Sequence, residues 1–416
     1  MWDRHLSRSR LGVLGQRNFA LFACGTTISS LGSAMVPVAL AFALFQQGAG
    51  PGRVSAVLAA EALPLVVLTL FGGVLADRYT PRYLMILADG LRAIAQLLLA
   101  LLLFVETASF SLTIILVSIV GIGGALDAPG RNRFLTQLVP FEVLPRANGV
   151  LMIAVSLSGL VGPALGGAFV ATSGAAWAIA LDSLSYIASA LMLMRVKTEH
   201  RPFPQETSSS LLKDLREGWS EFKQRRWVWL MVCFFAILHT LSWAPLEVLG
   251  ALRFAHLPKG ALHWGGIMSM MGAGAALGGV ISLKLRPERP VRAILFWLLL
   301  YPLSPLCLSI ALPYWAQLAC FFVGGMEMAN VNVLWESTLQ RAVPAEKLSR
   351  VSAYDSLGSF CLLPLGYALA GPLALLLGVT NALFLGGLLI LILTILLLSM
   401  PFVREVSGST PQELNP

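Results

Sequence analysis

Long apolar runs separated by short polar connections make up most of this 416-residue chain. A helix needs about 20 mainly apolar residues to cross the hydrocarbon core of a bilayer, and each run reaches that length. The runs cover residues 19–45, 54–76, 83–105, 109–129, 147–171, 175–195, 228–251, 264–284, 291–311, 314–338, 351–373 and 380–401. Because the runs are unbroken and do not alternate with polar residues, they predict membrane helices and not β-barrel strands.

The pattern therefore predicts an all-α integral membrane protein, with twelve transmembrane helices in two pseudo-symmetric six-helix bundles. We expect an N-terminal bundle over residues 1–195 and a cytoplasmic linker over 196–226. A C-terminal bundle over 227–402 and a cytoplasmic tail over 403–416 complete the chain. The linker contains LLKDLREGWSEFKQ, whose periodicity predicts an amphipathic helix lying along the membrane surface.

One motif supports the division into two related halves. Val-Pro-x-Glu-x-Leu-x-Arg occurs at residues 139–146 and again at 343–350, each time between the fourth and fifth run of its half. At the same shift, Gly162 corresponds to Gly366 and Gly167 to Gly371. Parallel six-helix repeats are a known construction of secondary transporters.

Composition and charge placement fix the expected environment. Only 12% of residues are charged, against about 25% in soluble domains. Most of the 29 Lys and Arg residues lie in alternate connections that share a side with the N-terminus, and Arg53, Arg253 and Lys259 lie in the others. The positive-inside rule then places both termini in the cytoplasm of a bacterial cell, as part of a multi-pass inner-membrane protein. The net charge of +8 is an inner-surface charge facing lipid, and no nucleic acid partner is expected.

Several kinds of chemistry lack their usual residues. The five cysteines lie inside apolar runs without CxxC spacing, so no metal site is expected. The sequence contains no HExxH, G-x-S-x-G or GxxxxGK[ST] motif, so the chain is not expected to be an enzyme. The arginines before the first run precede no small-residue cleavage site, which predicts a first spanning helix and not a removed signal peptide.

The connection between the second and third runs carries a recognisable pattern. Its sequence, GGVLADRYTPR, resembles the loop signature of the major facilitator superfamily, G-x-x-x-D-[RK]-x-G-x-[RK]-[RK]. The matching positions are Gly73, Asp77, Arg78 and Arg82. Thr80 replaces the usual glycine and Tyr83 replaces a second base. The resemblance implies a cytoplasmic gating loop, in which we expect Asp77 to pair with Arg131 and with the positive N-terminal end of the eleventh span near Arg350.

The fifth run resembles the antiporter motif of drug-exporting major facilitators. The matching residues are Gly149, Gly162, Pro163, Gly166 and Gly167, with Ser158 in place of one glycine. Small residues at this spacing also pack helices closely in any dense bundle, so the motif indicates either an exporter or packing alone. Across nearly the whole chain, the sequence resembles the drug- and siderophore-exporter branch that includes macrolide efflux proteins and the enterobactin exporter. That resemblance implies a monomeric carrier that moves its two bundles about a central cavity. Its energy would come from a proton gradient and it would need no cofactor.

Ionisable and amide residues inside the apolar runs are candidates for proton or substrate contact. A charged residue at mid-helix costs at least about 2.5 kcal/mol, so such residues are functional hypotheses. The candidates are Glu61, Glu327, Asp182, His239 and Asn330. The alternative is structural hydrogen bonding, for Asp182 with Ser183 or Ser185 and for His239 within the core. Aromatic and methionine side chains fit an apolar ligand or simple packing: Trp243, Met268, Met270, Met271 and Trp335.

The remaining buried charges are expected to shape the conformation. Asp89 and Arg92 are three residues apart on one helix face and should form an ion pair, as should Asp127 and Arg131. Asp355 is placed near a helix start, where the dipole favours an acid.

The sequence thus predicts a secondary transporter that exports a small amphipathic compound by proton antiport. The alternatives are a nutrient importer or uniporter, and a membrane sensor or scaffold that transports nothing.

Overall fold

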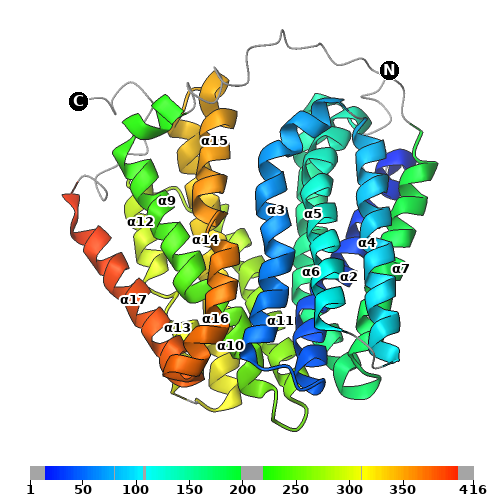
Figure 1. The fold of residues 1–416 in the computed structure, drawn as a ribbon. Helices are drawn as coiled ribbons and strands as arrows, with labels where there is room; N and C mark the ends of the chain where they lie inside the picture. Colours follow the sequence, from blue (N-terminus) through cyan, green and yellow to red (C-terminus); the bar gives the residue numbers. More distant parts are fainter. Residues whose placement is uncertain (1–14, 79, 106–108, 198–218, 311, 402–416) are drawn as a thin grey trace. The chain divides into compact units, whose positions relative to one another are not determined.

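The computed structural model describes residues 15–78, 80–105, 109–197, 219–310 and 312–401, without the side chains of 69–78, 345–346 and 349–350. These residues form helices joined by short turns, and no strand occurs among them (Figure 1). The helices are α2 (Arg17–Gln46), α3 (Pro51–Arg78), α4 (Pro81–Phe104), α5 (Phe110–Leu138), η2 (Phe141–Val143), α6 (Leu144–Thr172), α7 (Ala175–Arg195), α9 (Arg226–Leu238), η3 (His239–Trp243), α10 (Ala244–Phe254), α11 (Gly260–Ser282), α12 (Pro290–Leu298), α13 (Leu303–Ser309), α14 (Tyr314–Ala342), α15 (Ala345–Phe360), α16 (Leu363–Leu377) and α17 (Val379–Ser399).

The predicted number of spans is confirmed, because the described residues contain 12 helical segments that are long and apolar enough to cross a membrane. Most ends agree with the hydrophobic pattern to within a few residues. Helices α5 and α14 continue beyond their apolar runs to Leu138 and Ala342, where their last turns carry polar residues. A hydropathy pattern cannot detect such extensions, since the backbone hydrogen bonds of a helix continue regardless of side-chain polarity.

Three spans of the second half are interrupted, which the sequence pattern did not predict. Span seven consists of α9 and α10 joined by the π-helical turn η3, a local widening that occurs often at functional sites. Span nine breaks at residues 299–302 and span eleven at 361–362. Pro302 and Pro364 lie at these breaks, where each removes a backbone donor and disfavours a continuous helix.

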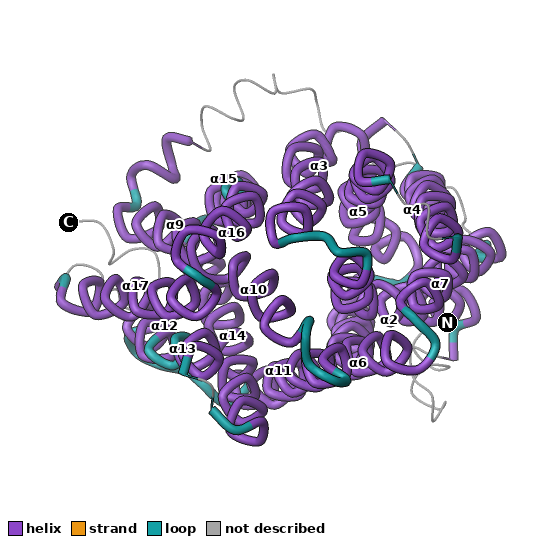
Figure 2. The backbone as a smooth tube through the Cα atoms, turned by 60° about the horizontal axis from the view of Figure 1, so that its bottom comes forward, coloured by secondary structure: helices purple, strands orange, loops and turns teal. Residues whose placement is uncertain are grey.

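The chain forms two compact units. The first comprises Met1–Ala49, Ala56–Phe203 and Phe254–Ser269. Within it α2 packs against α6 and α7, and α4 packs against α5 and α7 (Figure 2). Phe19, Phe22 and Phe134 are fully buried at one end of this unit. The rings of Phe22 and Phe134 meet edge to face at 5.4 Å.

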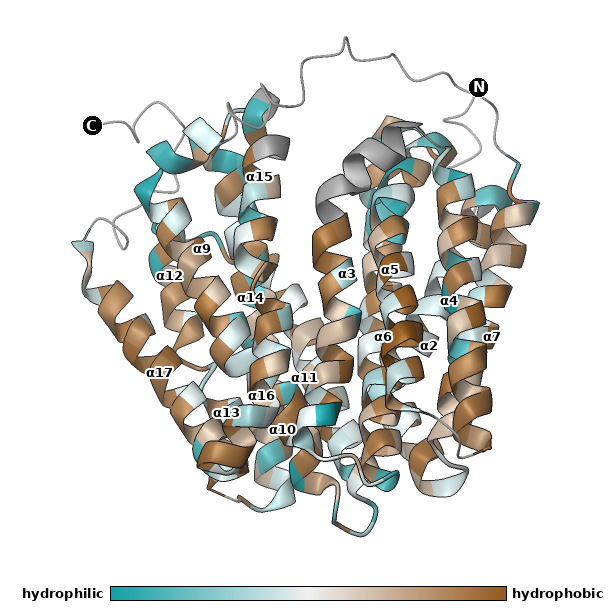
Figure 3. Cartoon of the chain, viewed as in Figure 1, coloured by the Kyte–Doolittle hydropathy of each residue, from teal (hydrophilic) through white to brown (hydrophobic). Residues whose placement is uncertain are grey.

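The second unit comprises Gly50–Ser55, Pro204–Arg253 and Met270–Pro416. Its α12 and α13 pack against α14 and α17, and α9 packs against α15. Met231, Ile294 and Leu295 are fully buried in its core, and Trp335 adds an aromatic ring. Apolar residues are also exposed: Ile392, Ile395 and Leu396 on α17 are each about half exposed. Figure 3 shows that α17 is hydrophobic along most of its length. An apolar exterior is expected where the surrounding solvent is lipid.

The motif repeated in the two halves has a similar backbone at its Val-Pro pair, after which the first copy forms η2 and the second enters α15 directly. Val139 and Val343 have extended backbones and are the C-cap residues at which α5 and α14 end. Pro140 and Pro344 follow with φ −60° and −54° and similar extended ψ. Since proline fixes φ near −65° and disfavours helix in the residue before it, the repeated Val-Pro pair stops one helix and starts the next.

Candidate functional site

A network of buried charges crosses the first unit from α4 to α5. Arg92 Nη2 lies 2.6 Å from Asp89 Oδ1 and 3.4 Å from Asp127 Oδ1, and Arg131 forms an ion pair with the other oxygen of Asp127. Arg92 is only 8% exposed and Asp89 1%. The two predicted pairs are confirmed, and the Arg92–Asp127 contact joins them into one network. Buried charges are tolerated when each has a partner.

The network continues onto α7 and α2. The Arg92 guanidinium lies 4.3 Å from the ring centroid of Tyr186, and the Tyr186 hydroxyl is 2.8 Å from Ser33 Oγ. Asp182 is fully buried, and its carboxylate accepts from Gln96 Nε2 at 3.0 Å and from Ser185 Oγ at 3.3 Å. Ser185 was one of the two expected partners. Ser183, the other, donates to the Ala93 carbonyl instead.

Glu61 on α3 is half-buried beside this network and interacts electrostatically with Asp182 and Tyr186. Its backbone carbonyl faces Gly121 of α5, where an added β-carbon would lie 2.1 Å from the oxygen. The glycine therefore allows the two helices to touch at Glu61. Three of the candidate and paired acids, Glu61, Asp182 and Asp89, thus belong to one polar region within a single unit.

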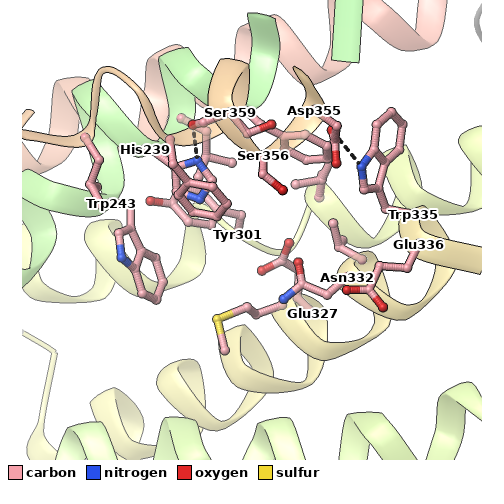
Figure 4. Close-up of a pocket in the computed structure, with 17 residues that line it drawn as sticks. His239, Trp243, Tyr301, Glu327, Asn332, Trp335, Glu336, Asp355, Ser356 and Ser359 are labelled. Atoms are coloured by element: carbon pink, nitrogen blue, oxygen red, sulfur yellow. Dashed lines mark hydrogen bonds between the residues drawn. The ribbon is translucent and has the colours of Figure 1, made fainter. Parts of the chain in front are cut away.

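The second unit contains a cavity of about 400 Å³, shown in Figure 4. Its wall is made by α9, η3, α12, the turn after α12, α14, α15 and the start of α16. The lining residues are Phe235, Leu238, His239, Trp243, Leu298, Tyr301, Glu327, Met328, Val331, Asn332, Trp335, Glu336, Asp355, Ser356, Ser359, Phe360 and Leu363. This volume lies within the range of about 300–1,000 Å³ typical of small-molecule sites.

Glu327 is the most distinctive group in the cavity wall. It is 3% exposed, and among the described residues it has no hydrogen-bond or ion-pair partner. Its carboxylate points into the cavity (Figure 4). The buried Ser359 hydroxyl in the same wall also has no hydrogen-bond partner within the described part of the chain. Buried polar groups normally have partners, so these two are available to a ligand.

Other polar groups of the cavity are held in place. His239 Nδ1 donates to the Ser359 carbonyl at 3.0 Å, and its ring lies 4.4 Å from that of Phe360. Trp335 Nε1 donates to Asp355 Oδ1 at 3.0 Å. These bonds fix side chains from η3, α14 and α15 around the cavity.

Two expectations for this half need correction. Asn330 does not line the cavity: it is fully buried, donates to the Met326 carbonyl and accepts from Ser282 Oγ at 2.9 Å. It joins α14 to α11, and Asn332 is the amide at the cavity. Asp355 does not cap a helix, because α15 begins at Ala345 and places it well beyond the first turn.

The apolar candidates divide between the cavity wall and other places, and one half-buried acid, Glu247, was not among the candidates. Of the expected apolar contacts, Trp243 and Trp335 line the cavity, whereas the three methionines do not. Glu247 on α10 accepts a hydrogen bond from Tyr367 on α16, and both Glu247 and Glu327 interact electrostatically with Tyr301. The rule that selected Glu327, an acid inside an apolar run, would also have selected Glu247.

The predicted gating loop is mostly helix. Residues Gly73, Asp77 and Arg78 belong to the last turns of α3, and α4 begins at Pro81. Since the segment before Arg78 contains no proline, the helical hydrogen bonds of α3 continue to Arg78. The side chains of Asp77 and Arg350 lie outside the described residues. Arg82 Nε donates to the Leu193 carbonyl at 2.9 Å, so Arg82 satisfies the C-terminal end of α7.

The small residues of the fifth span make close helix contacts. A β-carbon at Gly162 would lie 2.4 Å from Ala34 Cβ, and one at Gly166 would lie 2.5 Å from the Met35 carbonyl oxygen, both on α2. Gly167 faces the Ala261 carbonyl in the same way, while Gly149 has open space around it. Pro163 lies within α6, which continues through it.

Comparison with known proteins gives a consistent family. Residues 8–413 match the model of a family described as transmembrane secretion effector (MFS_3). The chain is 23% identical over 390 residues to macrolide efflux protein A of Streptococcus pyogenes, covering 92% of this chain and 95% of that protein. It is 26% identical over 347 residues to the enterobactin exporter EntS of Escherichia coli, covering 82% of each.

A solved structure of the nucleoside transporter NupG has the same fold, with a TM-score of 0.72 and 11% identity. The match covers 92% of this chain and 98% of that one. The resemblance stated from the sequence, including the two named exporters, is confirmed.

Proposed function

Because this chain belongs to the transmembrane secretion effector family of the major facilitator superfamily, we propose that it exports a small amphipathic compound in exchange for protons. As a member of that family it is a membrane transporter and not an enzyme. Macrolide efflux protein A and EntS, both exporters by name, support the outward direction.

The proposed coupling of export to proton uptake rests on the buried carboxylate of Glu327. A carboxylate that is 3% exposed and has no partner among the described residues is costly to keep charged. Binding a proton or binding a substrate each relieves that cost, and the two compete for one group. We propose that substrate leaves on the outer side as Glu327 takes up a proton, and that loss of the proton to the cytoplasm prepares the site again.

The first unit supplies a second set of candidates for the proton. Asp182 and Glu61 interact with each other beside the Arg92 network. Asp182 already accepts two hydrogen bonds, which stabilise its charged form. Glu327 accepts none among the described residues, so it is the stronger candidate for reversible protonation.

Transport in inside-out membrane vesicles tests this function. The probes are three amphipathic dyes of different charge: rhodamine 123 as cation, Nile red as neutral compound and carboxyfluorescein as anion. An acidic vesicle interior should drive uptake of at least one dye, and collapsing the gradient should stop it. Glu327→Gln should remove the gradient-dependent part. Glu288→Gln, in an exposed connection of the same unit, is the matched control and should leave it unchanged.

Two results would contradict the proposal. Gradient-driven uptake that is intact in Glu327→Gln would exclude this residue as the proton carrier. Uptake in right-side-out vesicles with an acidic exterior, together with none in inside-out vesicles, would indicate the importer that the sequence left as an alternative.

We propose that the protein is a monomer of the bacterial inner membrane, with both termini in the cytoplasm. The distribution of Lys and Arg among the connections supports this orientation. Fusion of green fluorescent protein to the C-terminus should give fluorescent cells, because that protein folds in the cytoplasm. Fusion of alkaline phosphatase at the same place should be inactive.

A further inference from the structure

The charge of the cavity in the second unit is one-sided. Its 17 lining residues include Glu327 and Glu336 of α14 and Asp355 of α15, and none is Lys or Arg. The acids come from two helices and converge on one space (Figure 4). Such a wall attracts cations and repels anions, more strongly than in water because the surroundings have a low dielectric.

The acids of α14 lie on one stripe of that helix. Glu327, Val331 and Trp335 follow each other at intervals of four residues, and Met328, Asn332 and Glu336 form the adjacent row. Residues with this spacing face the same side of a helix. The position of the acids in the cavity wall therefore follows from the helix geometry and does not depend on one side-chain rotamer.

Aromatic rings form much of the remaining wall. Phe235, Trp243, Tyr301, Trp335 and Phe360 all line the cavity. The Trp335 ring is fixed edge to face against Phe235 at 5.3 Å and by its hydrogen bond to Asp355. Aromatic faces attract cations, and the attraction is stronger when water is excluded. A ring-lined acidic cavity thus suits a cation with an apolar body.

Unpaired groups in the wall indicate that a ligand completes the site. Glu327 and Ser359 are each at most 5% exposed and have no hydrogen-bond partner among the described residues. No Lys or Arg lines the cavity, and the basic side chain that does, His239, donates to the Ser359 carbonyl and forms no ion pair with Glu327. A bound cation would supply that missing partner, whereas a bound anion would add a second unpaired charge.

We propose that this cavity binds lipophilic organic cations, compounds in which a single positive charge is attached to aromatic or alkyl groups. This inference rests on the proposed function and narrows its substrate from amphipathic compounds in general to cationic ones.

Tetraphenylphosphonium and tetraphenylborate test the proposal, because both place four phenyl groups around a central atom and they differ in the sign of charge. Equilibrium dialysis measures saturable binding of each ion to the purified protein in nanodiscs of neutral lipid, after subtraction of empty nanodiscs. Tetraphenylphosphonium should bind saturably and tetraphenylborate should not. Glu327→Gln should weaken binding of the cation at least tenfold, and Glu288→Gln should leave it unchanged.

Glu336→Gln provides a second variant, because this exposed side chain is not needed for packing. It should weaken cation binding at least threefold while the thermal unfolding curve stays the same. Equal or tighter saturable binding of tetraphenylborate would overturn the proposal, as would unchanged cation binding in both Glu327→Gln and Glu336→Gln.

The dye experiment separates the two proposals. Gradient-driven uptake of Nile red or carboxyfluorescein, without binding of tetraphenylphosphonium, would leave the exporter in place and remove the cation site. Binding of tetraphenylphosphonium without uptake of any dye would keep the cation site and remove the exporter.

Discussion

Replacing Arg92 by leucine should destabilise the first unit strongly. Arg92 lies between Asp89 and Asp127, at 2.6 Å and 3.4 Å, and all three are less than a tenth exposed. After the change Asp127 keeps Arg131, but the Asp89 carboxylate loses its cation. Removing one partner of a buried ion pair costs about 3–5 kcal/mol. Asp89→Asn should cost less, about 1.5–3 kcal/mol, because Arg92 keeps Asp127.

A double-mutant cycle tests this reasoning. The free energy of unfolding is measured by titration with sodium dodecyl sulfate in mixed micelles, for each single variant and for Arg92→Leu with Asp89→Asn. The double variant should lose less than the sum of the singles, by about 1–3 kcal/mol, since the unpaired carboxylate is gone. Arg146→Leu, an exposed arginine of α6, is the control and should cost about 0.5 kcal/mol or less. If the two single losses of stability add, or if Arg92→Leu costs no more than the control, the Arg92–Asp89 ion pair does not stabilise the fold.

Three further predictions address helix contact, the amides of α14 and the linker. Gly121→Ala should cost about 1–3 kcal/mol of stability, because its β-carbon would lie 2.1 Å from the Glu61 carbonyl oxygen. Gly149→Ala is the control, because its β-carbon would lie in open space. Equal unfolding temperatures of the two variants would contradict the contact at Gly121. Asn330→Ala should lower stability by about 1–3 kcal/mol and spare tetraphenylphosphonium binding, whereas Asn332→Ala should weaken binding and spare stability. Lys347 and Arg225 hold the pKa of Glu221 below its usual range. The stability that these two ion pairs contribute is therefore fully present above about pH 4.3, the pKa of Glu in the unfolded chain. It is lost as the pH falls through the lower pKa of Glu221 in the folded protein. Hydrogen exchange in residues 219–224, corrected for its intrinsic rate, should rise only in acid, and Glu221→Gln should remove that pH dependence.

Of the predicted linker helix, the structure describes only the last part. Residues 219–224 are helical, as expected for the end of LLKDLREGWSEFKQ, and the rest of that segment lies outside the described residues. Its aromatic side faces α15: the Trp219 ring lies 5.6 Å from that of Tyr354. Glu221 adds an ion pair to Lys347 at the start of α15. The amphipathic pattern predicted a helix with one apolar face, but the pattern could not show that this face packs against α15.

Local pairs along one helix were predictable, and pairs between helices were not. A spacing of three or four residues is enough to place Asp89 beside Arg92 and Asp127 beside Arg131, because a helix brings such residues onto one face. That Arg92 also reaches Asp127 depends on how α4 and α5 pack. The same holds for Asp182, whose partner Gln96 is on another helix. For Asn330 the sequence could not decide between a ligand and a neighbouring helix, because both satisfy an amide equally well.

The sequence by itself determined the twelve spans, the repeated halves and the short list of buried acids. These follow from local physics, since each apolar run must be long enough for lipid and each charge within it has a cost. Only the tertiary structure decided that Glu327, among the described buried acids, has no hydrogen-bond or ion-pair partner. Glu327 and Asp182 look alike in sequence, each an acid within an apolar run. Packing gives Asp182 two donors and leaves Glu327 facing a cavity, because hydrogen bonding depends on distances between helices that the order of residues does not specify.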